Sequence, residues 1–121
     1  MKLTLDNRSN NWIRGYDANG IRVSDRHIQG NCLISAESIS EWAAAVEITL
    51  SDLQPVLALK PEVVILGLVD MQRLPAAAIY AAFLESGIGF EVMDIGAACR
   101  TFNILLGEDR RAVAAFILTA R

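Results

Sequence analysis

The strongest constraint on the fold is a regular alternation of strand and helix patterns from Val63 onwards. The run VVILGLV is β-branched and apolar throughout, as in a strand buried on both faces. A helix from Pro75 to Ser86 follows, ended by Gly87 in the position of a C-cap glycine. Next come a strand in IGFEVMD, a helix in AACRTFNILL that ends at Gly107, and a strand in RRAVAAFIL. Because such alternation implies parallel strands joined by right-handed crossovers, we expect an α/β fold.

The N-terminal third has β character instead. WIRGY and IRV flank DANG, whose Asn19-Gly20 step suits a turn that needs positive φ, and HIQGNCLI supplies another alternating run. We therefore expect two or three antiparallel strands here. The stretch SAESISEWAAAVEI stays open, since Ser38 to Glu41 resembles a capping box but could also be extended.

A short helix is expected in SDLQPVLAL, capped by Ser51 and stopped near Lys60-Pro61. Pro55 must then lie in its first turn or kink it. No repeat, low-complexity segment or long linker interrupts the 121 residues, of which 53% are hydrophobic and 21% charged. The expected fold class is thus a single α/β domain over residues 1–121, with a mixed, mainly parallel sheet, flanking helices and a β-rich N-terminal layer.

Charge and hydropathy exclude several classes of function. The net charge is −3 and no basic run exceeds Arg110-Arg111, so we expect no nucleic-acid binding. The longest charge-free apolar stretches are too short to span a bilayer, which needs about 20 helical residues. The start MKLTLDNRSNNW lacks the apolar core of a signal peptide, so we expect a cytoplasmic protein without membrane insertion.

Cys32, Cys99 and His27 are the only cysteines and histidine, and they are scattered along the chain. A structural zinc site needs four ligands with at least one close pair, and a disulfide is disfavoured in a reducing compartment. We therefore expect two free thiols, no metal and no cofactor.

A candidate binding site follows from the predicted parallel strands. Ligands of open α/β sheets bind outside the carboxyl ends of the strands, where loops enter helix N-termini. Two such ends are DMQRLP, after Val69, and DIGAACR, after Met93. If the two strands are neighbours, their polar residues converge on one edge of the sheet. The candidate binding residues are Asp70, Gln72, Arg73, Asp94, Gly96, Cys99, Arg100 and Asn103.

Helical spacing divides the faces of the helix that begins in AACR. Ala98, Phe102 and Leu105 form one face, expected in the core, while Arg100 and Asn103 form the opposite one, open to solvent, ligand or partner. Helix N-terminal amides beside a guanidinium could seat a carboxylate or phosphate.

Structural roles compete with each of these readings. Arg100 could simply pair with Asp70 or Asp94, and both acids could be ordinary helix N-caps rather than an acid/base pair. Cys99 would have thiolate character only if exposed, and no partner for nucleophilic catalysis is identifiable. We therefore assign no catalytic residue.

The helix from Pro75 to Ser86 carries no charge before Glu85. A helix that is apolar nearly all round is buried on more than one side. Either another part of the chain covers it or a second subunit does, which makes it the expected contact of a homo-oligomer.

The stretch EVMDIGAACRTFNILLGEDRRAVAAFIL resembles a family of small domains, found in bacteria and archaea, that includes the adipogenesis-associated domain-containing protein and a mitochondrial complex I assembly factor. The resemblance covers nearly the whole chain, and its most specific piece is Met93-Asp94 followed by Ala98-Cys99-Arg100-Thr101 and Asn103. The family often has G-T-G where this chain has Gly67-Leu68-Val69, and tyrosine where it has Phe102. The resemblance therefore implies no role here for the second glycine, the threonine or the tyrosine hydroxyl of the family pattern.

The resemblance implies an α/β fold with a mixed sheet, no catalytic activity, and a link to the assembly of a respiratory complex. With the absence of a complete catalytic set, it favours a non-enzymatic interaction or assembly factor whose partner is a protein. The alternative is an anion or small-molecule binding protein, or an enzyme, that uses the crevice around Arg100 and Cys99.

Overall fold

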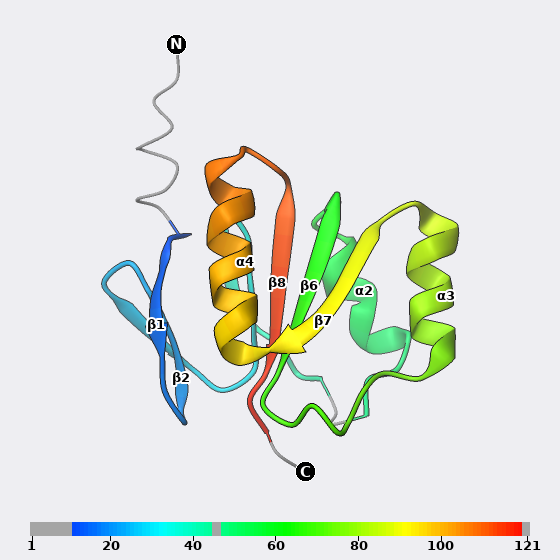
Figure 1. Cartoon of the computed structure of the whole chain (residues 1–121), viewed down its shortest axis with the longest axis horizontal. Coiled ribbons are helices and arrows are strands. Elements are labelled where there is room, and N and C mark those ends of the chain that lie inside the picture. The colour runs from blue at the N-terminus through cyan, green and yellow to red at the C-terminus, as the bar shows by residue number, and fades with distance from the viewer. Residues whose placement is uncertain (1–10, 45–46, 120–121) are drawn as a thin grey trace.

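The computed structural model describes residues 11–44 and 47–119, which form a mixed α/β fold (Figure 1). The N-terminal part is an antiparallel sheet of β1 (Ile13–Tyr16), β2 (Gly20–Val23) and β3 (Arg26–Gln29). The Asp17 carboxylate accepts hydrogen bonds from the backbone N–H groups of Asn19 and Gly20, at 2.9 and 3.0 Å, and so shapes the first hairpin turn. The predicted N-terminal antiparallel strands are confirmed, but neither Asn19 nor Gly20 adopts the positive φ expected of the turn between β1 and β2.

A 5-stranded sheet forms the centre of the fold, in the order β5-β4-β8-β6-β7. Parallel pairing joins β6 to both of its neighbours, and antiparallel pairing joins β4 to both of its neighbours. Its strands are β4 (Cys32–Ile34), β5 (Ile39–Glu41), β6 (Val63–Leu68), β7 (Gly89–Asp94) and β8 (Ala112–Ile117). The expected mixed sheet with a β-rich N-terminal layer is confirmed.

Burial explains the continuous apolar runs of the central strands. Every residue of β6 and β8 is buried, because helices cover both faces of the sheet there. On one face lies α4 (Ile95–Gly107), with β1–β3 packed beyond it. On the other lie η1 (Ser51–Leu53), α2 (Gln54–Leu57) and α3 (Ala77–Ser86).

Gly67 allows α4 to approach the sheet closely. A Cβ atom at this position would lie 2.9 Å from Ala98 Cβ on α4 and 2.9 Å from Phe116 Cδ1 on β8. Real Cβ atoms do not tolerate such contacts, so a larger residue would push the helix away. The first glycine of the G-T-G pattern thus has a packing role in this chain. Phe102 is fully buried in the same layer, where a tyrosine hydroxyl would need a partner.

Several predicted boundaries were wrong in detail. The stretch after Ser38 is the strand β5 and not a capped helix, because its backbone pairs with β4. Ser51 is not the cap of the next helix; Leu50 holds that position without a side-chain hydrogen bond, and Asp52 accepts from the Thr49 N–H.

The ends of α3 follow the prediction more closely. It begins at Ala77 rather than at Pro75, and it ends at Gly87, which is left-handed with φ of 71° as the C-cap prediction requires. Pro55 lies in the first turn of α2, as predicted.

Candidate functional site

The two predicted strand ends lie side by side. β6 and β7 are neighbouring parallel strands, and their register pairs Leu68 with Asp94. The condition on which the candidate site depends is therefore met at the level of the backbone.

Beyond that edge the two loops diverge, because α3 and α4 lie on opposite faces of the sheet. The loop after β6 lines a cavity of about 600 Å³, shared with the segment that precedes η1. Asp70, Gln72 and Arg73 line this cavity, together with Glu47, Ile48, Thr49, Leu74, Pro75 and Ala76. Asp94, Gly96, Cys99, Arg100 and Asn103 lie outside it.

The polar side chains in the cavity form interactions within the loop that follows β6. Asp70 Oδ1 accepts the backbone N–H of Gln72 at 3.0 Å, and Asp70 Oδ2 lies 3.7 Å from Arg73 Nε. The side chain of Arg73 is 46% exposed, so this pair is weak and its guanidinium stays accessible.

Asp94 is the N-cap of α4. Its Oδ1 accepts the backbone N–H of Ala97 at 2.8 Å, which satisfies one of the free amides at the helix start. Gly96, in the first turn of the helix, is covered by Tyr16 from β1: a Cβ at Gly96 would lie 2.6 Å from the Tyr16 hydroxyl. Little room remains over the first turn of α4 for an anion.

Arg100 is exposed, and its guanidinium lies near Gly96, with Nη1 3.4 Å from the Cβ position of that glycine. Within residues 11–44 and 47–119, Arg100 makes an ion pair with neither Asp70 nor Asp94. The structural pairing considered from the sequence is therefore not formed.

Asn103 is engaged by the backbone of β1. Its Nδ2 donates to the Ile13 carbonyl at 2.9 Å, and its Oδ1 accepts the Ile13 N–H at 2.9 Å. The prediction that Asn103 faces solvent or a ligand was wrong in this respect, because β1 covers that side of α4. The side chain acts as a neighbouring strand would, satisfying both polar groups of one edge residue.

The thiols of Cys99 and Cys32 are both buried in the layer between α4 and the sheet. Burial raises the pKa of Cys99 to about 11, against an ordinary 9.0, although the positive charge of Arg100 opposes the shift. Burial also raises the pKa of Cys32 to about 12, with a smaller contribution from Cys99. Neither thiol has the thiolate character that a nucleophile needs.

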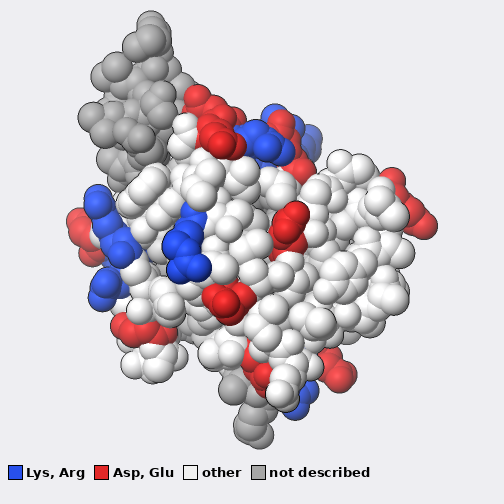
Figure 2. All heavy atoms as spheres, in the orientation of Figure 1, with Lys and Arg blue, Asp and Glu red and all other residues white. Residues whose placement is uncertain are grey.

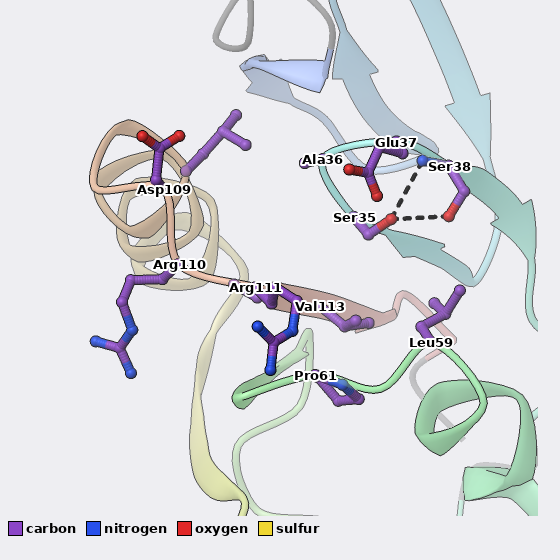
Figure 3. A pocket seen from close by; sticks show the side chains of 12 residues that line it. Ser35, Ala36, Glu37, Ser38, Leu59, Pro61, Asp109, Arg110, Arg111 and Val113 are labelled. Atoms are coloured by element: carbon purple, nitrogen blue, oxygen red, sulfur yellow. Dashed lines mark hydrogen bonds between the residues drawn. The ribbon is translucent and has the colours of Figure 1, made fainter. Parts of the chain in front are cut away.

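A second cavity, of about 530 Å³, lies at the opposite end of the sheet (Figure 3). Ser35 and Ser38, joined by a hydrogen bond between their hydroxyls at 2.8 Å, face Arg111 and Pro61 across it. The sequence gives no signal for this cavity, because the segments that line it come together only through the pairing of β4 with β8.

The cations beside this second cavity are already engaged. Arg110 Nε donates to Glu62 Oε1 at 3.0 Å, and Arg111 Nη1 lies 3.7 Å from Glu62 Oε2. Hydrogen bonds from Arg110 and from the Arg111 backbone lower the pKa of Glu62. The arginines therefore tie the start of β6 to the start of β8.

The exposed side of α3 is apolar. Only Ile79 and Phe83 of this helix are buried, so within the described residues no other part of the chain covers a second side of it, and cover by a second subunit stays a prediction. Leu84 is 82% exposed and Tyr80 40% exposed, one turn apart on the same stripe. Figure 2 shows that the surface over α3 and β7 bears acidic atoms but no basic ones.

Comparison with known proteins gives one family match. The model of a family described as "Protein of unknown function (DUF498/DUF598)" matches residues 13–117. A Xenopus tropicalis protein named NADH dehydrogenase [ubiquinone] 1 alpha subcomplex assembly factor 3 is 28% identical over 120 residues, which cover 96% of this chain and 66% of that protein. A Francisella tularensis protein named 13 kDa major membrane protein is 29% identical over 82 residues, which cover 64% of this chain and 67% of that protein.

Solved structures have the same fold. A Bordetella parapertussis protein is 31% identical with a TM-score of 0.78, covering 90% of this chain and 96% of its own. An outer membrane protein from Bartonella henselae is 29% identical with a TM-score of 0.75, covering 90% of this chain and 95% of its own. No helix in the described part of this chain is long and apolar enough to cross a bilayer.

Proposed function

The chain belongs to the DUF498/DUF598 family of proteins of unknown function. We propose a role for it that rests on its own exposed residues and on its similarity to an assembly factor. The protein is a non-enzymatic interaction protein that helps to assemble a larger protein complex. Respiratory complex I is the first candidate for that complex, because of the name of the Xenopus tropicalis relative.

The observation that carries this proposal is the apolar stripe on α3. Leu84 is largely exposed one turn from the partly exposed Tyr80, and exposed large apolar side chains that neighbour each other on one helix favour a protein contact. The residues that would carry chemistry at the strand ends have structural tasks instead: Asp94 caps α4, Asn103 binds β1 and Cys99 is buried.

The experiment is a deletion of the gene in the source organism. Solubilised membranes are separated on a native gel and stained for NADH oxidation. The proposal predicts that intact complex I falls severalfold, that its subassemblies accumulate, and that the reintroduced gene restores the complex. Unchanged complex I in the deletion strain contradicts the link to this complex.

A second form of the proposal has another copy of the chain bind the α3 stripe. The mass of the purified protein in solution, measured over a hundredfold range of concentration, tests this form of the proposal. A dimer that Leu84→Arg dissociates supports it, and a monomer at all concentrations excludes it.

We place this function in the cytoplasm. The free, buried state of Cys32 and Cys99 supports a reducing compartment. Fractionation of cells followed by immunodetection tests the placement, and recovery of the protein in the outer membrane fraction contradicts it.

The alternative function is binding of a small anion. It rests on the cavity beside Asp70, where Gln72 and Arg73 offer donors to a ligand. A thermal-shift screen with phosphates, nucleotides and carboxylates tests it, because a ligand of the native state raises the melting temperature. The alternative requires a shift that Arg73→Ala abolishes and that Arg100→Ala, a change outside this cavity, leaves in place.

A further inference from the structure

The outer edge of β7 is an open sheet edge. Among the described residues no strand pairs with β7 on the side away from β6. Its residues are more exposed than those of β6, which are all buried. Gly89, Glu91 and Asp94 are exposed, and the rest of β7 is half-buried. The other edge strand, β5, has only three residues, so β7 is the longer template for an added strand.

The hydrogen bonds between β6 and β7 determine which backbone groups of β7 point away from β6. Gly89 donates its N–H to the Glu62 carbonyl at 3.0 Å, so its polar groups point toward β6. Successive residues of a strand alternate in this respect, and the backbone groups of Phe90 and Val92 therefore point outward. An incoming strand would pair with these two residues.

The α3 side of this edge is apolar. Phe90 stacks on Phe83 with ring centroids 4.2 Å apart, and Tyr80 meets the edge of Phe90 with centroids 5.3 Å apart. The stripe of Tyr80 and Leu84 thus lies beside β7, as Figure 1 shows for the two elements. Alternate side chains of an added strand would pack on this stripe.

The opposite side of the edge carries one exposed acidic side chain. Glu91 alternates with Phe90 and Val92, so its side chain points to the other face of the sheet, where it is exposed. Of the acidic residues between Leu74 and Cys99, Glu85 belongs to α3 and Asp94 caps α4, so Glu91 is the charged residue that β7 itself presents on this face. Charge complementarity therefore calls for basic side chains on that face of an added strand.

A second copy of the chain fits this edge poorly. Two β7 strands could pair in the antiparallel direction with both α3 helices on one face of the joined sheet. The two Glu91 side chains would then lie on the same face, either directly opposite or diagonal to each other. Like charges at such positions destabilise a strand pair.

Resting on the proposed interaction function, we propose that β7 binds an extended segment of another protein, with apolar residues alternating with lysine or arginine, by strand addition. The apolar residues contact Tyr80 and Leu84, and the basic residues pair with Glu91. Main-chain hydrogen bonds to Phe90 and Val92 supply affinity that does not depend on sequence, and the alternation supplies specificity.

The test uses three synthetic peptides with the full-length protein. One alternates lysine and valine, the second alternates glutamate and valine, and the third has the lysine and valine residues in blocks. Binding is measured by titration, and amide hydrogen exchange by NMR. The alternating lysine peptide is expected to bind at least about tenfold more tightly than the other two, and to slow exchange at the Phe90 and Val92 amides about tenfold or more.

Charge reversal at the two sheet edges provides the matched variants. Glu91→Lys is expected to reverse the preference toward the glutamate peptide, whereas Glu41→Lys, the same change on the opposite edge strand β5, leaves it unchanged. Equal binding of the block peptide, or unprotected Phe90 and Val92 amides, overturns the proposal. Protection of these amides that rises with protein concentration alone overturns it in favour of a second copy. If the peptides fail while Leu84→Arg still abolishes complex assembly in cells, the interaction function stands and only strand addition is wrong.

Discussion

The side-chain amide of Asn103 on α4 completes the hydrogen bonding of Ile13 on β1, donating to its carbonyl and accepting its N–H, each at 2.9 Å. The two residues are far apart in sequence, so this pair fastens the N-terminal sheet to the helix that follows β7.

Asn103→Ala is expected to lower the free energy of unfolding by about 2 kcal/mol, since two partly buried hydrogen bonds are lost and the Ile13 backbone groups are left unpaired. Urea denaturation measures the change. Ile104→Ala, at a 60% exposed position of the same helix, is the control and should change stability by less than about 0.5 kcal/mol. Equal effects of the two substitutions would show that Asn103 does not hold β1.

Gly67→Ala is expected to destabilise the fold by about 1–3 kcal/mol, because the new methyl group overlaps Ala98 and Phe116. Gly89→Ala is the comparison variant and is expected to cost less, since its Cβ makes a tight but smaller overlap, with Val63 Cγ2 at 3.2 Å. Thermal unfolding of both variants gives the comparison. A Gly67→Ala protein as stable as the wild type would mean that α4 does not need this close approach.

The thiols are expected to be unreactive in the native protein. A pKa of about 11 for Cys99, against an ordinary 9.0, lowers its thiolate fraction at pH 8 about a hundredfold, and burial hinders access further. A chromogenic disulfide reagent should therefore label the native protein far more slowly than the denatured one. Rapid labelling of one thiol in the native state would revive Cys99 as a reactive group.

Glu62 is expected to make stability depend on pH in acid. Its pKa is lowered in the folded state by hydrogen bonds from Arg110 and the Arg111 backbone. The stabilisation is therefore present above the ordinary pKa and lost as the pH falls through the folded value. The melting temperature of Glu62→Gln should lie below that of the wild type at pH 7 and approach it toward pH 3. A constant difference over this range contradicts an ionic contribution.

The patterns from Val63 onwards were sufficient to predict the order of strands and helices, because periodicity and glycine caps are local signals. They could not predict on which face each helix packs, which depends on the spatial order of the strands. The strands before Asp70 and Asp94 are neighbours, but the helices that follow them lie on opposite faces, so Asp70 lines the cavity and Asp94 does not.

Asn103 and Leu84 show that the surroundings of a single side chain could not be predicted from local sequence either. Helical spacing placed Asn103 away from the core, but the layer that covers it comes from residues far away in the sequence. The composition of the helix ending at Ser86 predicted burial on several sides, whereas only Ile79 and Phe83 are buried. The exposed remainder is the surface on which the proposed function rests.

The most direct test of the central claim compares Leu84→Arg with Arg100→Ala in cells that lack the wild-type gene. Both positions are exposed, so both variants should fold, and the amounts of soluble protein are measured alongside complex assembly. If the protein acts through the α3 surface, Leu84→Arg fails to restore the complex and Arg100→Ala restores it. Restoration by Leu84→Arg together with failure of Arg100→Ala would contradict the account and place the function at the carboxyl ends of the parallel strands.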